Sequence, residues 1–186
     1  EAIQPLERLW ERGGVSADDK SEAMVLLAER GNTSILNEVV TSVLEQVESD
    51  PEGAAKVLTA LSDAAKQREM KPDKGLDLIL PLFAHWNDSV QLAAIHLSGS
   101  WKLARAVSEL KTLISNPDTN NHILASAVTS LVSVGSKNAK NALSEHASSD
   151  LPVKTRIAVA AGFASADTKQ ATGLVVKLLE ELEAGD

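Results

Sequence analysis

The feature that most constrains the fold of this chain is a turn signal that recurs along it. Five aspartates, each placed after one apolar stretch and before the next, lie 30 to 38 residues apart: Asp18, Asp50, Asp88, Asp118 and Asp150. Aspartate is favoured at the N-cap of a helix, where its carboxylate accepts hydrogen bonds from unpaired backbone amides. Self-similarity at such a period is typical of proteins built from stacked helical hairpins. We therefore expect each aspartate to cap a helix.

The apolar residues between these turns follow the period of an amphipathic helix, and no alternating strand pattern is present. Three stretches can be aligned on an i, i+4, i+7 stripe, which is the core face of a helix. The stripes are Val90, Ala94 and Leu97; Ile123, Ala127 and Ser130; and Val153, Ile157 and Ala160. We expect helices over 3–12, 16–30, 33–48, 51–69, 73–86, 88–99, 102–115, 119–134, 137–148, 151–164 and 167–183.

The stretch LILPLFAHWNDSVQLAAIHLSG (78–99) resembles a HEAT repeat. It has a proline inside an apolar helix, Pro81, then a turn aspartate, Asp88, then a valine that opens the second helix, Val90. The basic residue that usually follows that valine is replaced by Gln91 here and by Leu124 in a later repeat. The resemblance covers nearly the whole chain as about five degenerate repeats.

This resemblance implies an all-α fold, a right-handed α-α superhelix in which antiparallel helix pairs stack as a solenoid. We expect residues 1–186 to form a single repeat domain that is a segment of a larger protein. A hairpin cannot bury its apolar face alone, so neighbouring repeats must share one continuous core.

Charge and composition exclude several classes of partner and cofactor. The net charge is −8, which disfavours nucleic acid and anionic membrane surfaces as partners. The chain has no cysteine and no apolar run long enough for membrane insertion. These observations assign no compartment, and both the cytoplasm and an extracytoplasmic space are compatible with them.

The sequence shows no catalytic or metal-binding constellation, so we expect no enzyme activity, no cofactor and no metal. The four histidines lie in different helices or turns, and no pair has metal-ligand spacing. Alignment of AVSEL (106–110) with ALSEH (142–146) puts His146 where the sister repeat has Leu110. We interpret His146 as a packed core residue.

In the HEAT family the second helix of each pair lines the concave binding surface. The resemblance therefore implies a binding surface for a protein or peptide at Gln91, Ile95, His96, Leu124, Val128, Lys154 and Ala158. The alternative is that the apolar row Ile95, Val128 and Ala158 packs between repeats. Trp86 and Trp101 have two similar alternatives: core packing at hairpin corners, or an exposed anchor for a partner.

We expect a non-enzymatic protein–protein interaction scaffold or a rigid spacer module. One alternative is a connecting module of a larger bacterial extracytoplasmic redox or haem protein, a context in which HEAT-like segments occur. Another is a HEAT-like enzyme of the DNA glycosylase or bilin lyase type. The acidic charge and the absence of tyrosine disfavour this last alternative.

Overall fold

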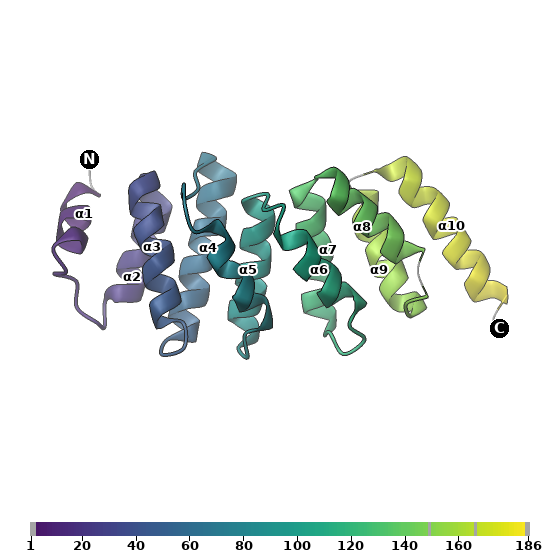
Figure 1. The fold of residues 1–186 in the computed structure, drawn as a ribbon, viewed down its shortest axis with the longest axis horizontal. Coiled ribbons are helices and arrows are strands. Elements are labelled where there is room, and N and C mark those ends of the chain that lie inside the picture. Colours follow the sequence, from purple (N-terminus) through teal and green to yellow (C-terminus); the bar gives the residue numbers. More distant parts are fainter. Residues whose placement is uncertain (1–2, 149, 166, 185–186) are drawn as a thin grey trace. The chain divides into compact units, whose positions relative to one another are not determined.

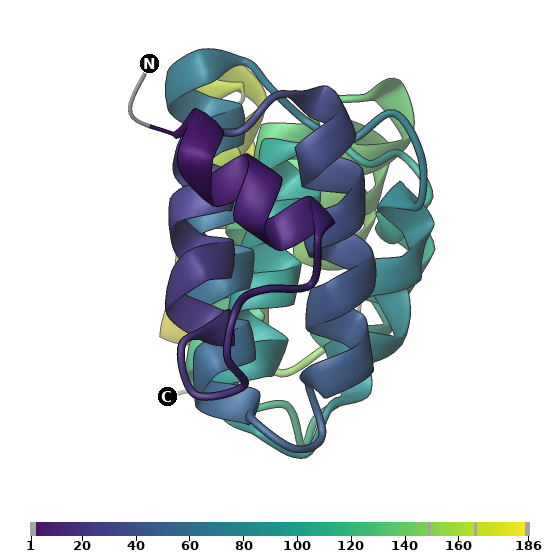
Figure 2. The same cartoon turned by 90° about the vertical axis from the view of Figure 1, so that its left-hand side faces the viewer.

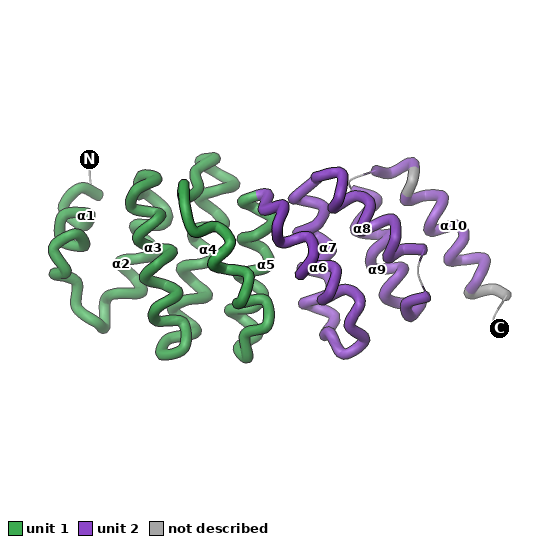
Figure 3. The backbone as a smooth tube through the Cα atoms, viewed as in Figure 1, with its two compact units in different colours: residues 1–101 green, residues 102–186 purple. Residues whose placement is uncertain are grey.

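The fold is all-α, as the sequence predicts. The computed structural model describes residues 3–148, 150–165 and 167–184, and within these ranges it contains helices and no strands (Figure 1). The helices are α1 (Gln4–Glu11), α2 (Lys20–Arg30), α3 (Thr33–Gln46), α4 (Pro51–Arg68), the 3-10 helix η1 (Leu76–Ala84), α5 (Asp88–Ser100), α6 (Ala106–Ser115), α7 (Asn121–Val134), α8 (Lys137–Ala147), α9 (Val153–Ala164) and α10 (Thr168–Ala184). They divide into two compact units, residues 1–101 and residues 102–186 (Figure 3).

In the first unit, one layer of helices is formed by α2, α4 and α5, with α4 packed between the other two. Helix α3 packs on α2 and α4, and η1 packs on α5, so these two elements cover that layer. Figure 2 looks at this unit from its α1 end and shows α2 and α3 side by side behind α1. The consecutive elements α2 and α3, α3 and α4, and η1 and α5 pack on each other, as expected for helical repeats.

In the second unit, α6 pairs with α7 and α8 pairs with α9, while α7 also packs on α9. Helix α10 then packs on α9. Gly162 of α9 makes the close approach of α7 possible, because a Cβ at this position would lie 2.2 Å from Cγ1 of Val128. The absent side chain of Gly162 therefore sets how closely α7 and α9 pack.

The predicted core stripes are confirmed in the first two of the aligned helices. Their members are almost fully buried: Val90, Ala94, Leu97, Ile123, Ala127 and Ser130. In the third stripe Ala160 is buried but Ile157 is 39% exposed, and the side chains buried beside Ala160 are Val159 and Phe163. The buried face of α9 is therefore not the face that the alignment predicts.

Of the five recurrent aspartates, only Asp50 caps a helix with its side chain. The prediction that Asp88 is a cap is wrong, because Asn87 occupies that position and its side chain accepts from the amide of Val90. Asn120 does the same for α7, and α9 begins after Pro152. Asparagine serves as well as aspartate at an N-cap. The recurrent turns therefore do mark helix starts, but the capping residue lies one or two positions from the predicted aspartate.

The segment around Pro81 is a 3-10 helix rather than a kinked α-helix. Proline has no amide proton and clashes with the preceding turn of an α-helix. A 3-10 helix has three residues per turn. Gln91 binds the end of this segment to the next helix, because its side-chain amide donates to the carbonyl of Phe83.

Asp50 ties α2 to the start of α4. One of its oxygens accepts from the Ser21 hydroxyl at 2.6 Å, and the other accepts from the amide of Gly53 at 2.9 Å. Gln46 donates to the same Ser21 hydroxyl at 2.9 Å. The Ser21 hydrogen bond lowers the pKa of Asp50, and the Gly53 amide and the charge of Lys56 lower it further.

We expect Asp50→Asn to destabilise the protein in a pH-dependent way. Asparagine keeps the cap but loses the charge that strengthens the Ser21 bond. Because the folded-state pKa of Asp50 is lowered, its contribution is complete above the unfolded-state value of about 3.9 and is lost as the pH falls. In urea denaturation, the free-energy difference between wild type and D50N should be largest near about pH 7 and shrink towards about pH 3. The pH dependence of the difference should weaken in a Ser21→Ala background, where the Gly53 amide and Lys56 still act on Asp50. A difference independent of pH in the wild-type background would contradict the assignment.

We expect Gly162→Ala to destabilise the second unit although alanine favours helices. The helical propensity gains about 1 kcal/mol, but overpacking against Val128 costs about 1–3 kcal/mol. Gly173 of α10 is a matched control, because no heavy atom lies within 4 Å of a Cβ built there. Thermal denaturation should show a lower Tm for G162A, a higher Tm for G173A, and partial recovery when Val128→Ala is added to G162A. Equal effects of the two glycine substitutions would show that the packing contact does not matter.

Candidate functional site

Three residues of the predicted concave surface lie in the core. Ile95 is fully buried, and Leu124 and Val128 are 8% and 2% exposed. Each belongs to a helix that packs against other helices of its own unit. The packing alternative therefore describes Ile95 and Val128, while Ala158 is half-buried.

In α5 and α7 the exposed residues follow the buried Ile95, Leu124 and Val128 by one position, whereas in α9 the predicted Lys154 is itself exposed. His96 of α5, Ala125 and Thr129 of α7, and Lys154 and Ile157 of α9 are exposed. One residue is a rotation of about 100° on a helix. A role for His96 and Lys154 in binding stays a prediction, whereas the Gln91 amide is committed to the Phe83 carbonyl.

His96 of α5 lies near the charge of Lys66 on α4 in the first unit. Partial burial of its ring lowers the pKa of His96, and the nearby charge of Lys66 on α4 lowers it further. Both effects favour the neutral imidazole. This part of the α4–α5 surface therefore presents one lysine charge beside a neutral histidine.

Trp101 is buried, so the core-packing alternative describes it. It is 2% exposed, and its backbone carbonyl accepts from Nζ of Lys71 at 3.5 Å. An indole in this position offers a partner no surface.

Trp86, in contrast, is 68% exposed and is held in a fixed orientation. Its indole N–H donates to Oε2 of Glu48 at 3.1 Å. One face of the ring stacks on His85, with the ring centroids 5.3 Å apart and the planes inclined by 29°. The structure thus places Trp86 as an exposed aromatic side chain whose orientation is set before any partner arrives.

His85 lies beside Trp86 and supports it. Its side chain is only 4% exposed, and its Nδ1 accepts from the backbone amide of Asn87 at 3.1 Å. In the neutral ring the proton is therefore on Nε2, which faces Oε1 of Glu48 at 3.6 Å. Asn87 also donates from Nδ2 to Oε1 of Glu52 at 3.2 Å. We call Glu48, Glu52, His85, Trp86 and Asn87 the Trp86 cluster.

A concavity lies near the N-terminal end of the first unit. It has a volume of about 670 Å³, and its lining includes Trp10, Lys20, Asn37 and Glu38. The Trp10 indole donates to Oε2 of Glu38 at 3.1 Å, which closes one side of it. Oδ1 of Asn37 accepts from the amides of Asp73 and Lys74 and so holds the loop after α4.

Comparison with known proteins gives one match. The family model of HEAT repeats matches residues 76–164. The match agrees with the HEAT-repeat resemblance seen in the sequence. No curated protein and no solved structure matches the chain significantly.

The HEAT match begins at η1 and ends at the last residue of α9, so it includes the Pro81 segment on which the resemblance rests. In the part of the chain that the structure describes, no helix is long and apolar enough to cross a membrane. Within the same ranges, no three or more His, Cys, Asp or Glu side chains are grouped so as to hold a metal ion.

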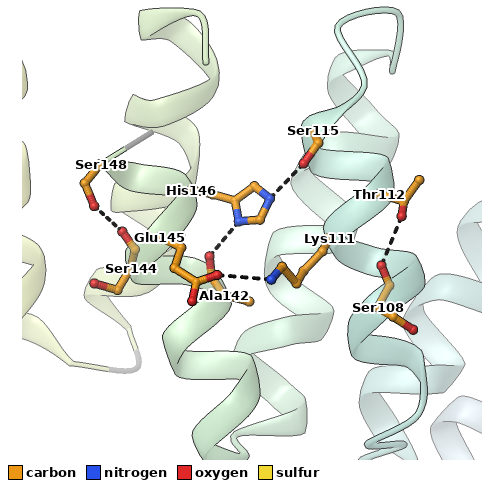
Figure 4. A network of polar contacts seen from close by, with 9 residues as sticks. All are labelled: Ser108, Lys111, Thr112, Ser115, Ala142, Ser144, Glu145, His146 and Ser148. Carbon is orange, nitrogen blue, oxygen red and sulfur yellow. Dashed lines mark hydrogen bonds and ion pairs between the residues drawn. The ribbon is translucent and has the colours of Figure 1, made fainter. Parts of the chain in front are cut away.

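Within the matched residues, His146 joins α8 to α6 (Figure 4). It is 7% exposed, and the aligned Leu110 is fully buried, which confirms it as a packed residue. Its Nδ1 faces the carbonyl of Ala142 at 2.7 Å and must donate there, so in the neutral ring Nε2 accepts from the Ser115 hydroxyl at 2.9 Å. The ion pair between Lys111 and Glu145 at 3.0 Å joins the same two helices at the surface.

We expect His146→Leu to be tolerated and His146→Ala to be destabilising. Leucine fills the same volume, as Leu110 does in the aligned repeat, and exposed Ser115 can hydrogen-bond to water instead. The leucine variant should lie within about 1 kcal/mol of wild type, whereas the cavity left by alanine should cost about 2 kcal/mol. Chemical denaturation of the three proteins measures this. Equal losses in both variants would mean that the hydrogen bonds of the ring, and not its volume, carry the stability.

Proposed function

We propose that this chain is a non-catalytic helical-repeat module that binds a protein partner. The observation that carries the proposal is the state of Trp86. An exposed indole whose N–H and one face are already held loses little conformational freedom on binding. Tryptophan is also among the residues most enriched at the energetic centres of protein interfaces.

The same observation favours binding over a spacer role. A spacer fixes the distance between the parts that it connects through its core and its ends. Its exposed surface needs only polar residues. Trp86 instead exposes a large apolar ring at the corner between η1 and α5. Glu48 lies in the turn between α3 and α4, so residues from two separate turns hold that ring.

The histidine geometry supports the non-catalytic part of the proposal. In each neutral ring the nitrogen that could take a proton already accepts a hydrogen bond: Nδ1 of His85 from the amide of Asn87, and Nε2 of His146 from the Ser115 hydroxyl. A general base must be free to take a proton from a substrate. Both imidazoles are placed to stabilise corners and helix pairs.

A capture experiment with matched variants tests this function. Wild type, Trp86→Ala and Leu179→Ala are immobilised and exposed to an extract of the source organism, and bound proteins are quantified by mass spectrometry after cross-linking. Leu179 of α10 is 52% exposed and controls for the loss of any exposed apolar side chain. We expect at least one protein whose capture falls about tenfold or more with W86A and is unchanged with L179A. Identical capture by all three proteins would contradict binding through Trp86, and turnover of a small substrate by the purified chain would contradict the non-catalytic role.

A further inference from the structure

An apolar stripe leads along η1 towards Trp86. Because a 3-10 helix has three residues per turn, residues three apart share one face. Leu78, Pro81 and Ala84 form such a row, and all three are exposed, Leu78 to 53%. The buried face of the same helix is formed by Ile79, Leu82 and Phe83. We call the exposed row the η1 stripe.

Carboxylates surround the aromatic end of this stripe. Glu48 is held against the indole N–H of Trp86, and Glu52 is held against the side chain of Asn87. Asp88, the next residue along the chain, is exposed. In the described ranges, no lysine or arginine forms an ion pair with any of these three carboxylates. Their negative charge is therefore not neutralised within the unit.

A buried polar atom within the cluster is also left without a hydrogen bond. Nε2 of His85 has no hydrogen-bond partner in the protein, and because the side chain is only 4% exposed, water has little access to it. It faces Glu48, whose side chain is 74% exposed and which also accepts from Trp86. Glu48 thus joins the buried histidine, the exposed indole and the solvent. A carboxylate has about four acceptor positions, so Glu48 can still accept from an incoming cation.

We propose that the Trp86 cluster and the η1 stripe bind a basic amphipathic segment of a partner protein. The inference rests on the proposed function and names the chemistry of the partner. An arginine or lysine of the segment lies on the open face of Trp86, where the ring attracts a cation, and its charge is met by Glu48, Glu52 and Asp88. An apolar side chain of the same segment covers the η1 stripe.

Arginine fits this site better than lysine. Its planar guanidinium stacks on an aromatic ring and donates to a carboxylate through two parallel bonds at the same time. The indole and the Glu48 carboxylate are adjacent, so both interactions are available to one side chain. An anionic partner such as a nucleic acid or an acidic lipid surface would meet three like charges at the same place.

Fluorescence anisotropy with a defined peptide tests the proposal. The probe is a fluorescein-labelled peptide of about 14 residues, with Arg and Leu placed on opposite faces of a helix. Two comparison peptides replace every Arg by Glu, or every Leu by Ser. We expect the Arg–Leu peptide to bind at least about tenfold more tightly than either comparison, because it matches both the carboxylates and the apolar stripe.

Variants of the protein separate the cluster from the overall negative charge. Trp86→Ala should weaken the Arg–Leu peptide by about tenfold or more. The triple variant Glu48→Gln, Glu52→Gln, Asp88→Asn should do the same while keeping the indole. A charge-matched control, Glu11→Gln, Glu109→Gln, Glu180→Gln, changes exposed residues of α1, α6 and α10 and should weaken binding by less than about threefold. Circular dichroism confirms that each variant is folded, and the two cluster variants test the site independently.

The outcomes distinguish the inference from the function on which it rests. Equal weakening by the cluster and control triple variants would show attraction by net charge alone and would overturn the inference. Equal binding of the Arg and Glu peptides would also overturn it, while Trp86-dependent capture of a protein partner would still uphold the proposed function. If no protein is captured in a Trp86-dependent way while the peptide still binds as expected, the proposed function is overturned and the inferred chemistry of the site is upheld.

Discussion

The packing of helices side by side within one layer is the interaction on which the rest of this structure depends. Helix α4 lies between α2 and α5, and α7 packs on α9. Close packing favours small residues, and Gly162 of α9 and Gly53 of α4 lie against Val128 and Ser21 of neighbouring helices. The contacts within a layer bury one face of these helices and leave another face exposed, and a partner must bind at the exposed positions.

Polar contacts at the ends of helices then fix how each hairpin meets the next. Asp50 connects α4 to Ser21 of α2, and Arg68 donates to the carbonyls of Glu29 and Gly31 where α2 ends. These bonds satisfy backbone groups that a helix end leaves unpaired. The Trp86 cluster belongs to the same kind of corner, but there the arrangement leaves an aromatic ring at the surface.

The sequence predicts the helices well because their ends are set by local chemistry. Caps, prolines and apolar periodicity act within a few residues, and the predicted and observed helices agree closely. The direction of a side chain around a helix depends on neighbours that local periodicity does not reveal. In α5 and α7 the exposed residues therefore follow Ile95, Leu124 and Val128 by one position, although the predicted His96 and Lys154 are exposed. The sequence alone identifies only part of the Trp86 cluster. Trp86 was an evident candidate, but Glu48 and Glu52 lie more than thirty residues earlier, and only the fold brings them to it.

The contact between Val128 and Gly162 also restricts motion along the helix axes. A methyl group of Val128 occupies the space left by the missing side chain of Gly162. Sliding α9 past α7 by one helical turn, about 5.4 Å, would move that methyl group towards Ala158, one turn earlier on α9, which has a side chain in the way. The contact between Val128 and Gly162 therefore opposes sliding of α9 along α7.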